Sequence, residues 1–107
     1  MRAILIDVVA GGIKEVETDG TLQSTYEVMG VDMIEVGTYL PNGDCIYVDE
    51  EGLIKGEVPG WFEVQGAHQP FAGNGLVVGT GKNGDTVACK STLTEIINLV
   101  HLPKGVA

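Results

Sequence analysis

The sequence predicts a small α+β domain in which a mixed or antiparallel sheet packs with two helices. Several short apolar segments with strand-like patterning are separated by Gly, Asn and Pro turn signals. Two other segments have apolar residues at helical spacing behind residues that favour helix N-caps. The 107 residues suffice for one hydrophobic core but not for two, so we expect a single domain over residues 1–107.

The first two strands are predicted to form a hairpin. Residues 3–9 are nearly all aliphatic, which indicates a strand that is covered on both faces and lies near the sheet centre. Asp7 is the exception, and we expect it at the strand end, where its carboxylate can cap a backbone turn. Gly11 and Gly12 signal that turn, and residues 13–18 return with the mixed polarity of a strand nearer an edge.

A short helix is expected after this hairpin. Asp19 or Thr21 can cap its beginning, and Gly30 supplies a C-terminal stop. Apolar residues recur at i, i+4 and i+7, so one stripe of the helix is predicted to face the sheet: Leu22, Tyr26 and Met29.

Residues 33–40 and residues 45–49 are predicted to pair as antiparallel strands. Asn42 and Gly43 between them tolerate positive φ, so we expect a two-residue hairpin turn. The order up to this point is strand, strand, helix, strand, strand. This order is similar to a β-grasp layout, in which the first and third strands would form the central pair of the sheet.

The second hairpin is followed by an acidic turn and then by the longest irregular segment, residues 53–69. Neighbouring carboxylates repel one another when they are buried, so we expect a solvated turn at Asp49, Glu50 and Glu51. Trp61 and Phe62 lie within the irregular segment. Long loops in small domains often carry binding residues, but the role that we favour for Trp61 is to anchor the loop over an open face of the sheet.

The last part of the chain is predicted to contain a second small hairpin and a helix. Residues 76–78 and residues 86–89 read as strands, and Asn-Gly at residues 83–84 indicates a two-residue turn between them. Thr92 and Glu95 have the spacing of a capping box, which opens a helix. We expect one face of this helix to be buried against the sheet: Leu93, Ile96, Ile97 and Val100.

The charge of the chain limits its choice of partners. Fifteen acidic and six basic residues give a net charge of -9. This charge repels nucleic-acid phosphates and anionic membrane surfaces, so we expect no direct binding to either, and it favours a protein partner with a basic surface. The apolar run near the N-terminus is too short to span a membrane and has no cleavage region, so we expect a cytoplasmic location.

The residue types that carry catalysis or metal binding do not occur at the required spacing. His68 and His101 have no acid or cysteine at ligand spacing, and Cys45 and Cys89 form no C-x-x-C motif. The two cysteines are expected as free thiols or as one disulfide. Residues 73–81 are rich in glycine, but no G-K-[ST] follows, so a phosphate loop is not expected. We therefore expect no enzymatic activity, no metal site and no cofactor.

Two stretches carry a resemblance to a known family: IYVDEEGLIKG at residues 46–56 and PFAGNGLVVGT at residues 70–80, with KNGDT behind them. They resemble the family called domain of unknown function 3846, and the resemblance runs from MRAILID to the C-terminal helix. Its members look like small accessory proteins of phages, plasmids and other mobile elements in bacteria. The resemblance implies no enzymatic activity, and its matching positions are Tyr47, Asp49, Glu50, Glu51, Gly52, Leu53, Gly73, Gly75 and Gly79.

Two classes of function follow. The first is a non-enzymatic accessory protein of a phage or other mobile element that acts by binding another protein, such as a host-defence protein or another host factor. The alternative is a protein that binds or sequesters a small ligand, such as a nucleotide signal, through residues 57–75. In either case we expect the binding surface where the acidic turn, the adjacent aromatic residues and the glycines meet: Asp49, Glu50, Glu51, Trp61, Phe62, Gly73 and Gly75.

Overall fold

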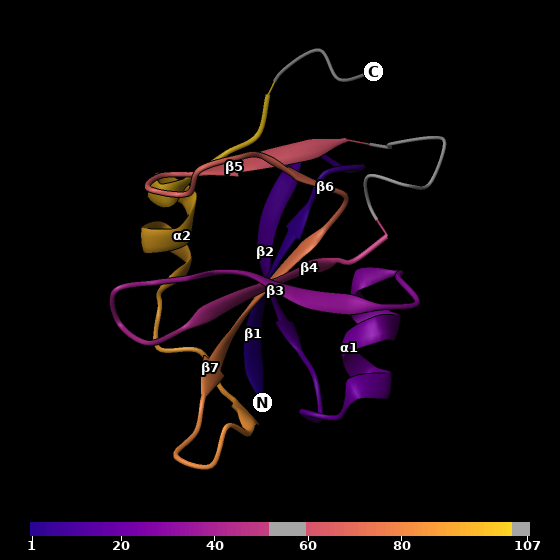
Figure 1. The fold of residues 1–107 in the computed structure, drawn as a ribbon, viewed down its shortest axis with the longest axis vertical. Helices are drawn as coiled ribbons and strands as arrows, with labels where there is room; N and C mark the ends of the chain where they lie inside the picture. The colour runs from indigo at the N-terminus through magenta and orange to yellow at the C-terminus, as the bar shows by residue number, and fades with distance from the viewer. Residues whose placement is uncertain (52–59, 104–107) are drawn as a thin grey trace.

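The computed structural model describes residues 1–51 and 60–103 of the chain, and Figure 1 shows its fold. Within these residues the main sheet has six strands that pair antiparallel in the order β2-β1-β7-β4-β3, with β8 beside β7. Its strands are β1 (Arg2–Asp7), β2 (Gly12–Glu17), β3 (Ile34–Tyr39), β4 (Cys45–Asp49), β7 (Gly75–Thr80) and β8 (Thr86–Val87).

A smaller antiparallel sheet has the order β6-β5-β9. Its strands are β5 (Trp61–Val64), β6 (Phe71–Ala72) and β9 (Val100–His101), and the helices are α1 (Leu22–Met29) and α2 (Leu93–Leu99). The expected small α+β fold with two helices is confirmed.

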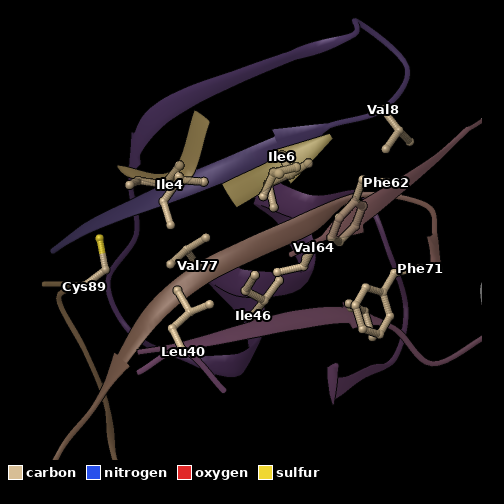
Figure 2. Packing of buried hydrophobic residues seen from close by; sticks show 13 residues of the cluster. Ile4, Ile6, Val8, Leu40, Ile46, Phe62, Val64, Phe71, Val77 and Cys89 are labelled. Carbon is tan, nitrogen blue, oxygen red and sulfur yellow. The ribbon is translucent and has the colours of Figure 1, made fainter. Parts of the chain in front are cut away.

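The main sheet is covered on both faces, and Figure 1 shows α1 and α2 on opposite sides of the molecule. Because successive side chains of a strand point to opposite faces, β1, β4 and β7 contribute to two cores. One core lies under α1: Ala3, Leu5, Met29, Cys45, Leu76 and Val78. The other lies under the smaller sheet and α2, and it includes Ile4, Ile6, Ile46, Val48, Phe62, Phe71, Val77 and Ile96. Figure 2 shows side chains from the second core.

Strand β7 lies at the centre of the main sheet, between β1 and β4. Its residues 75–79 are all buried, and they consist of glycine and aliphatic residues that can be covered from both faces. The prediction that the first and third strands form the central pair is therefore wrong. Strand β1 pairs with β7 instead, and β3 is the edge strand next to β4, so the β-grasp pairing does not occur.

The first hairpin forms as predicted. Strands β1 and β2 pair over their full length. Asp7 caps the turn, since its Oδ1 accepts hydrogen bonds from the N–H groups of Val9 at 3.1 Å and Ala10 at 2.9 Å. The polar residue in the aliphatic run is thus explained by the turn that it stabilises.

The turns after β3 and β7 are one residue longer than predicted. Each is a three-residue loop rather than a two-residue turn: residues 41–43 and residues 82–84. The N–H of Leu40 donates to the carbonyl of Asp44 at 2.8 Å, and the corresponding bond closes the loop after β7. Only the last residue of each loop has positive φ, 93° at Gly43 and 83° at Gly84. A type I turn followed by a left-handed glycine has this geometry, so the Asn-Gly pair signals the turn but not its length.

Both helix caps agree with the sequence. The hydroxyl of Thr21 accepts a hydrogen bond from the Ser24 N–H at 3.1 Å, and Gly30 ends α1 in the left-handed conformation. The capping box of α2 is complete, because Thr92 and Glu95 each accept a hydrogen bond from the other's backbone N–H.

The buried faces of both helices agree with the prediction only in part. In α1, Met29 is buried as predicted, whereas Leu22 is exposed and Thr25 is buried. In α2, Ile96 is 0% exposed whereas Ile97 is 50% exposed. Helices of seven or eight residues complete only about two turns, so a shift of one residue in the apolar pattern changes which side chain is buried.

The segment predicted to be irregular contains strand β5. Of that segment, residues 53–59 lie outside the described residues, and Trp61–Val64 pair with both β6 and β9. Phe62 and Val64 point into the core while Glu63 is exposed, which is the alternation of a half-buried strand. A strand of four residues offers too few repeats for this alternation to be recognised from the sequence.

Candidate functional site

The site is a hollow beside the edge strand β3, which we call the acidic groove. It has a volume of about 180 Å³ and lies between β3, the end of β4 and the segment that leads into β6. Its lining includes three acidic residues and two residues of the core under the smaller sheet: Glu35, Asp49 and Glu50 with Val48 and Phe71. The groove therefore lies between the β3 edge of the main sheet and the smaller sheet.

A β-bulge at Gly37 shapes the groove. The pairing of β3 with β4 shifts register between Val36 and Thr38. A Cβ atom at Gly37 would lie 2.7 Å from Val48 Cγ1 and 3.1 Å from Phe71 Cε1. Glycine is therefore required for the close approach of the smaller sheet to the backbone of β3.

The acidic turn is only partly solvated, so the prediction of a solvated turn is wrong for its first residue. Asp49 is buried, whereas Glu50 is exposed and Glu51 is partly exposed. The Oδ1 of Asp49 accepts a hydrogen bond from the Glu51 N–H at 2.9 Å, which fixes the turn. Gly73, with φ of 84°, lies against Asp49, because a Cβ atom there would be 3.5 Å from the Asp49 Cβ. The fold thus brings Gly73 against Asp49, although the two residues are distant in sequence.

Two of the predicted site residues lie in the core. Phe62 is fully buried, and its ring packs beside that of Phe71 with the centroids 5.5 Å apart (Figure 2). A Cβ atom at Gly75 would lie 2.6 Å from Phe62 Cζ, so the glycine makes room for the ring. These two residues position the smaller sheet rather than contact a partner.

Trp61 lies next to the groove but does not line it, as far as the described residues show. Its backbone pairs with Ala72, which is a lining residue, and its side chain is partly exposed. The adjacent aromatic pair is therefore divided between the core and the surface, as alternation along a strand requires.

Strand β3 contributes to the site in a way that was not predicted from the sequence. Val36 is 41% exposed and Tyr39 is 68% exposed, although both are large apolar residues in a strand. Glu35, which precedes Val36 in the same strand, lines the groove. The signal is the run IEVGTY, in which apolar residues alternate with an acid and a glycine. This run predicts a strand but does not show that the strand is an edge.

The acidic residues are concentrated on the part of the chain that forms this site. Residues 15–51 contain ten Asp and Glu residues and no Lys or Arg: Glu15, Glu17, Asp19, Glu27, Asp32, Glu35, Asp44, Asp49, Glu50 and Glu51. The same residues form half of β2, all of α1, and the β3–β4 hairpin. Three of the ten acids line the groove: Glu35, Asp49 and Glu50. The basic residues of the described chain lie in other segments: Arg2, Lys14, Lys82 and Lys90.

Cys89 is the side chain that comes closest to an activated nucleophile, but its surroundings favour the neutral thiol. Its Sγ lies 3.3 Å from Nη1 of Arg2, which lowers the pKa of the thiol. Burial is the larger effect and raises the pKa of Cys89, as it also raises that of Cys45. Both thiols are free and belong to cores on opposite faces of the main sheet, so the alternative of a disulfide is wrong.

Asp44 is a buried carboxylate with a structural role. It is fully buried and accepts hydrogen bonds from the Ser91 hydroxyl at 2.6 Å, the Ser91 N–H at 2.8 Å and the Lys90 N–H at 2.9 Å. These bonds connect the loop after β3 to the segment that precedes α2. Because the carboxylate is saturated by groups of the chain itself, it stabilises the fold and is not available to a ligand.

The part of the chain that the structure describes provides no further chemical centre. It contains no group of three or more His, Cys, Asp or Glu side chains that could hold a metal ion. None of its helices has the length and apolar character needed to cross a membrane.

The fold and the groove thus define a two-sheet α+β protein with an acidic surface. The family described as Domain of unknown function (DUF3846) matches residues 1–101, which is nearly the whole chain. The chain belongs to this family, and the resemblance seen in the sequence is confirmed. Comparison with curated proteins and with solved structures found no match.

Proposed function

We propose that this protein is a non-enzymatic accessory protein that binds another protein through a basic surface of that partner. The observation that carries the proposal is that the three acidic residues of the groove belong to residues 15–51, a segment with ten acids and no base. An acidic surface of this kind accelerates encounter with a basic partner and makes the association sensitive to salt. The exposed apolar side chains of Val36 and Tyr39 supply contact area beside it.

The groove suits a small nucleotide ligand less well. Its volume of about 180 Å³ is smaller than the range of roughly 300–1,000 Å³ that is typical of ligand sites. Glu35, Asp49 and Glu50 would repel phosphate groups. A larger hollow of about 410 Å³ between β5, β9 and the end of α2 is lined by Glu63 and has no Lys or Arg among its described lining residues.

The family suggests the biological setting of this binding. Members of the family look like small accessory proteins of phages, plasmids and other mobile elements, and this supports a role for the present protein in such an element. We therefore propose that the partner is a host-defence protein or another host factor, and that the two proteins meet in the cytoplasm.

Affinity capture with charge-matched variants tests the proposal. The groove variant Glu35→Lys with Glu50→Lys and the control variant Glu63→Lys with Asp85→Lys change the net charge equally, and all four residues are exposed. Immobilised wild-type and variant proteins are incubated with a nuclease-treated bacterial lysate, and the retained proteins and metabolites are measured by mass spectrometry. We expect wild type and control to retain the same basic protein, and the groove variant to retain about tenfold less of it.

Two results would contradict the proposal. Equal loss of the protein from both variants would show that total charge, not the groove, determines binding. Retention of a metabolite and no protein by wild type would favour the small-ligand function instead.

A further inference from the structure

We propose that the partner binds as an extended segment that adds to the open edge of β3 as a new strand. In this segment basic residues alternate with apolar residues. The basic side chains lie on the groove side of the sheet, and the apolar side chains lie over Val36 and Tyr39. This inference rests on the proposed function and adds to it the conformation and the residue pattern of the partner.

The backbone of β3 has donors and acceptors that point to its open edge. Residues of an antiparallel pair alternate between those that exchange hydrogen bonds and those that do not. The Glu50 N–H donates to the Met33 carbonyl at 3.2 Å, so Met33 and Glu50 are a hydrogen-bonded pair. By the alternation, the next pair, Ile34 with Asp49, is non-bonded, and so is the pair of Val36 with Tyr47. The N–H and carbonyl groups of Ile34 and Val36 therefore point away from β4, where an added strand can bind them.

The side chains of β3 divide between the two faces of the sheet. Glu35 is opposite Val48, which belongs to the core under the smaller sheet, and both line the groove. Val36 is opposite Tyr47, and Tyr39 is opposite Cys45; these partners belong to the core on the α1 side. An added strand thus meets carboxylates on one face and exposed apolar side chains on the other. Lysine or arginine alternating with aliphatic residues satisfies both faces.

The two edges of the main sheet differ in how they are protected. Strand β2 carries Lys14, Glu15 and Glu17, and charged side chains on an edge strand oppose strand addition. Strand β3 carries Glu35 as its one charged residue. The sheet is therefore open to a new strand at β3 rather than at β2.

Charge favours a basic segment over a second copy of this chain as the occupant. Pairing of two β3 edges would bring together Glu35 and the groove carboxylates of two molecules, each with a net charge of -9. The bulge at Gly37 also interrupts the regular edge that self-pairing requires. A basic segment needs only the groups of Ile34 and Val36 beside the groove.

The test uses end-blocked octapeptides of alternating lysine and valine, titrated into the full chain at low salt. Two further versions carry N-methyl groups, one on every valine and the other on every lysine. Along an extended strand the N–H groups of the valines and those of the lysines point to opposite edges, and the two methylated peptides carry the same charge. We expect one version to bind about tenfold more weakly than the other, because only one removes the N–H groups that face β3.

Variants of the protein provide the matching half of the test. Val36→Pro removes an N–H that points to the open edge, whereas Val36→Thr keeps that N–H. Glu17→Pro is the control at the other edge, since the Thr18 N–H bonds to the Met1 carbonyl and leaves the Glu17 N–H pointing outward. We expect Val36→Pro to bind the unmodified peptide about tenfold more weakly than Val36→Thr does, and Glu17→Pro to change its binding by less than about threefold relative to wild type.

Three results would overturn the inference. Equal affinity of the two N-methylated peptides, together with loss of binding in the Glu35→Lys and Glu50→Lys variant, would contradict strand addition and leave the proposed function intact. Absence of peptide binding to wild type at millimolar concentration would contradict a basic, apolar occupant. A dimer in sedimentation that Val36→Pro converts to monomer would identify a second copy as the occupant of the edge.

Discussion

Gly75 is the residue at which the backbone of the main sheet comes closest to the aromatic core. It lies in β7 beneath the ring of Phe62, and an added Cβ would overlap Phe62 Cζ at 2.6 Å. The glycine-rich character of residues 73–81 is evident from the sequence, but the side chain that fills the space at Gly75 is not, because Phe62 comes from another sheet.

Substitution of Gly75 by alanine is expected to destabilise the protein. The new methyl group must displace a buried ring, which costs roughly 1–3 kcal/mol of the free energy of unfolding. Gly84→Ala is a control for general effects of losing a glycine; it has open space around it, and it is strained only by its φ of 83°. Urea unfolding measures both, and a Gly75→Ala protein as stable as wild type would show that the Phe62 ring is not packed against β7.

Asp44 carries a second residue-scale prediction. Its carboxylate accepts hydrogen bonds from Lys90 and Ser91, so Asp44→Ala leaves buried donors without acceptors. We expect the free energy of unfolding to fall by roughly 2–4 kcal/mol. Thermal unfolding provides the measurement, with Asp85→Ala as the control for loss of an exposed carboxylate. Equal melting temperatures of the two variants would rule out the clamp between the β3–β4 loop and the segment before α2.

The elements of this fold were predictable where their signals are local. Thr92 and Glu95 are three residues apart in the chain, so their capping box could be identified from the sequence and is present in the structure. The Asn-Gly pairs likewise identified both hairpin turns. The buried face of each helix was predicted only in part: Met29, Ile96 and Val100 are buried as expected, but Leu22 and Ile97 are exposed, because burial also depends on which strands the helix crosses.

Helix α2 allows a direct comparison of neighbouring residues. Ile96 is 0% exposed and Ile97 is 50% exposed. Ile96→Ala is therefore expected to lower the free energy of unfolding by roughly 2–5 kcal/mol, and Ile97→Ala by less than about 1 kcal/mol. Chemical denaturation of the two variants is the measurement. A larger effect at Ile97 would mean that α2 is rotated relative to the arrangement described.

On the scale of the whole molecule, the site results from contacts that sequence order does not reveal. Strand β7 enters between β1 and β4 from the second half of the chain, and among the described residues this leaves β3 as an edge strand with β4 as its one neighbour. The segment before β6 then closes one side of the acidic groove. The acidic turn was predicted as part of the site, but its neighbours Glu35 and Val36 were not, because their exposure depends on this strand order.

Amide hydrogen exchange, measured residue by residue by NMR with and without the lysine–valine peptide, tests the central claim most directly. In the free protein the N–H groups of Ile34 and Val36 point to the open edge and should exchange rapidly, whereas that of Glu35 is bonded to β4 and should exchange slowly. With the peptide bound, we expect exchange at Ile34 and Val36 to slow by about tenfold or more while Glu35 stays unchanged. Unchanged exchange at Ile34 and Val36 under saturating peptide would contradict binding at the β3 edge beside the acidic groove.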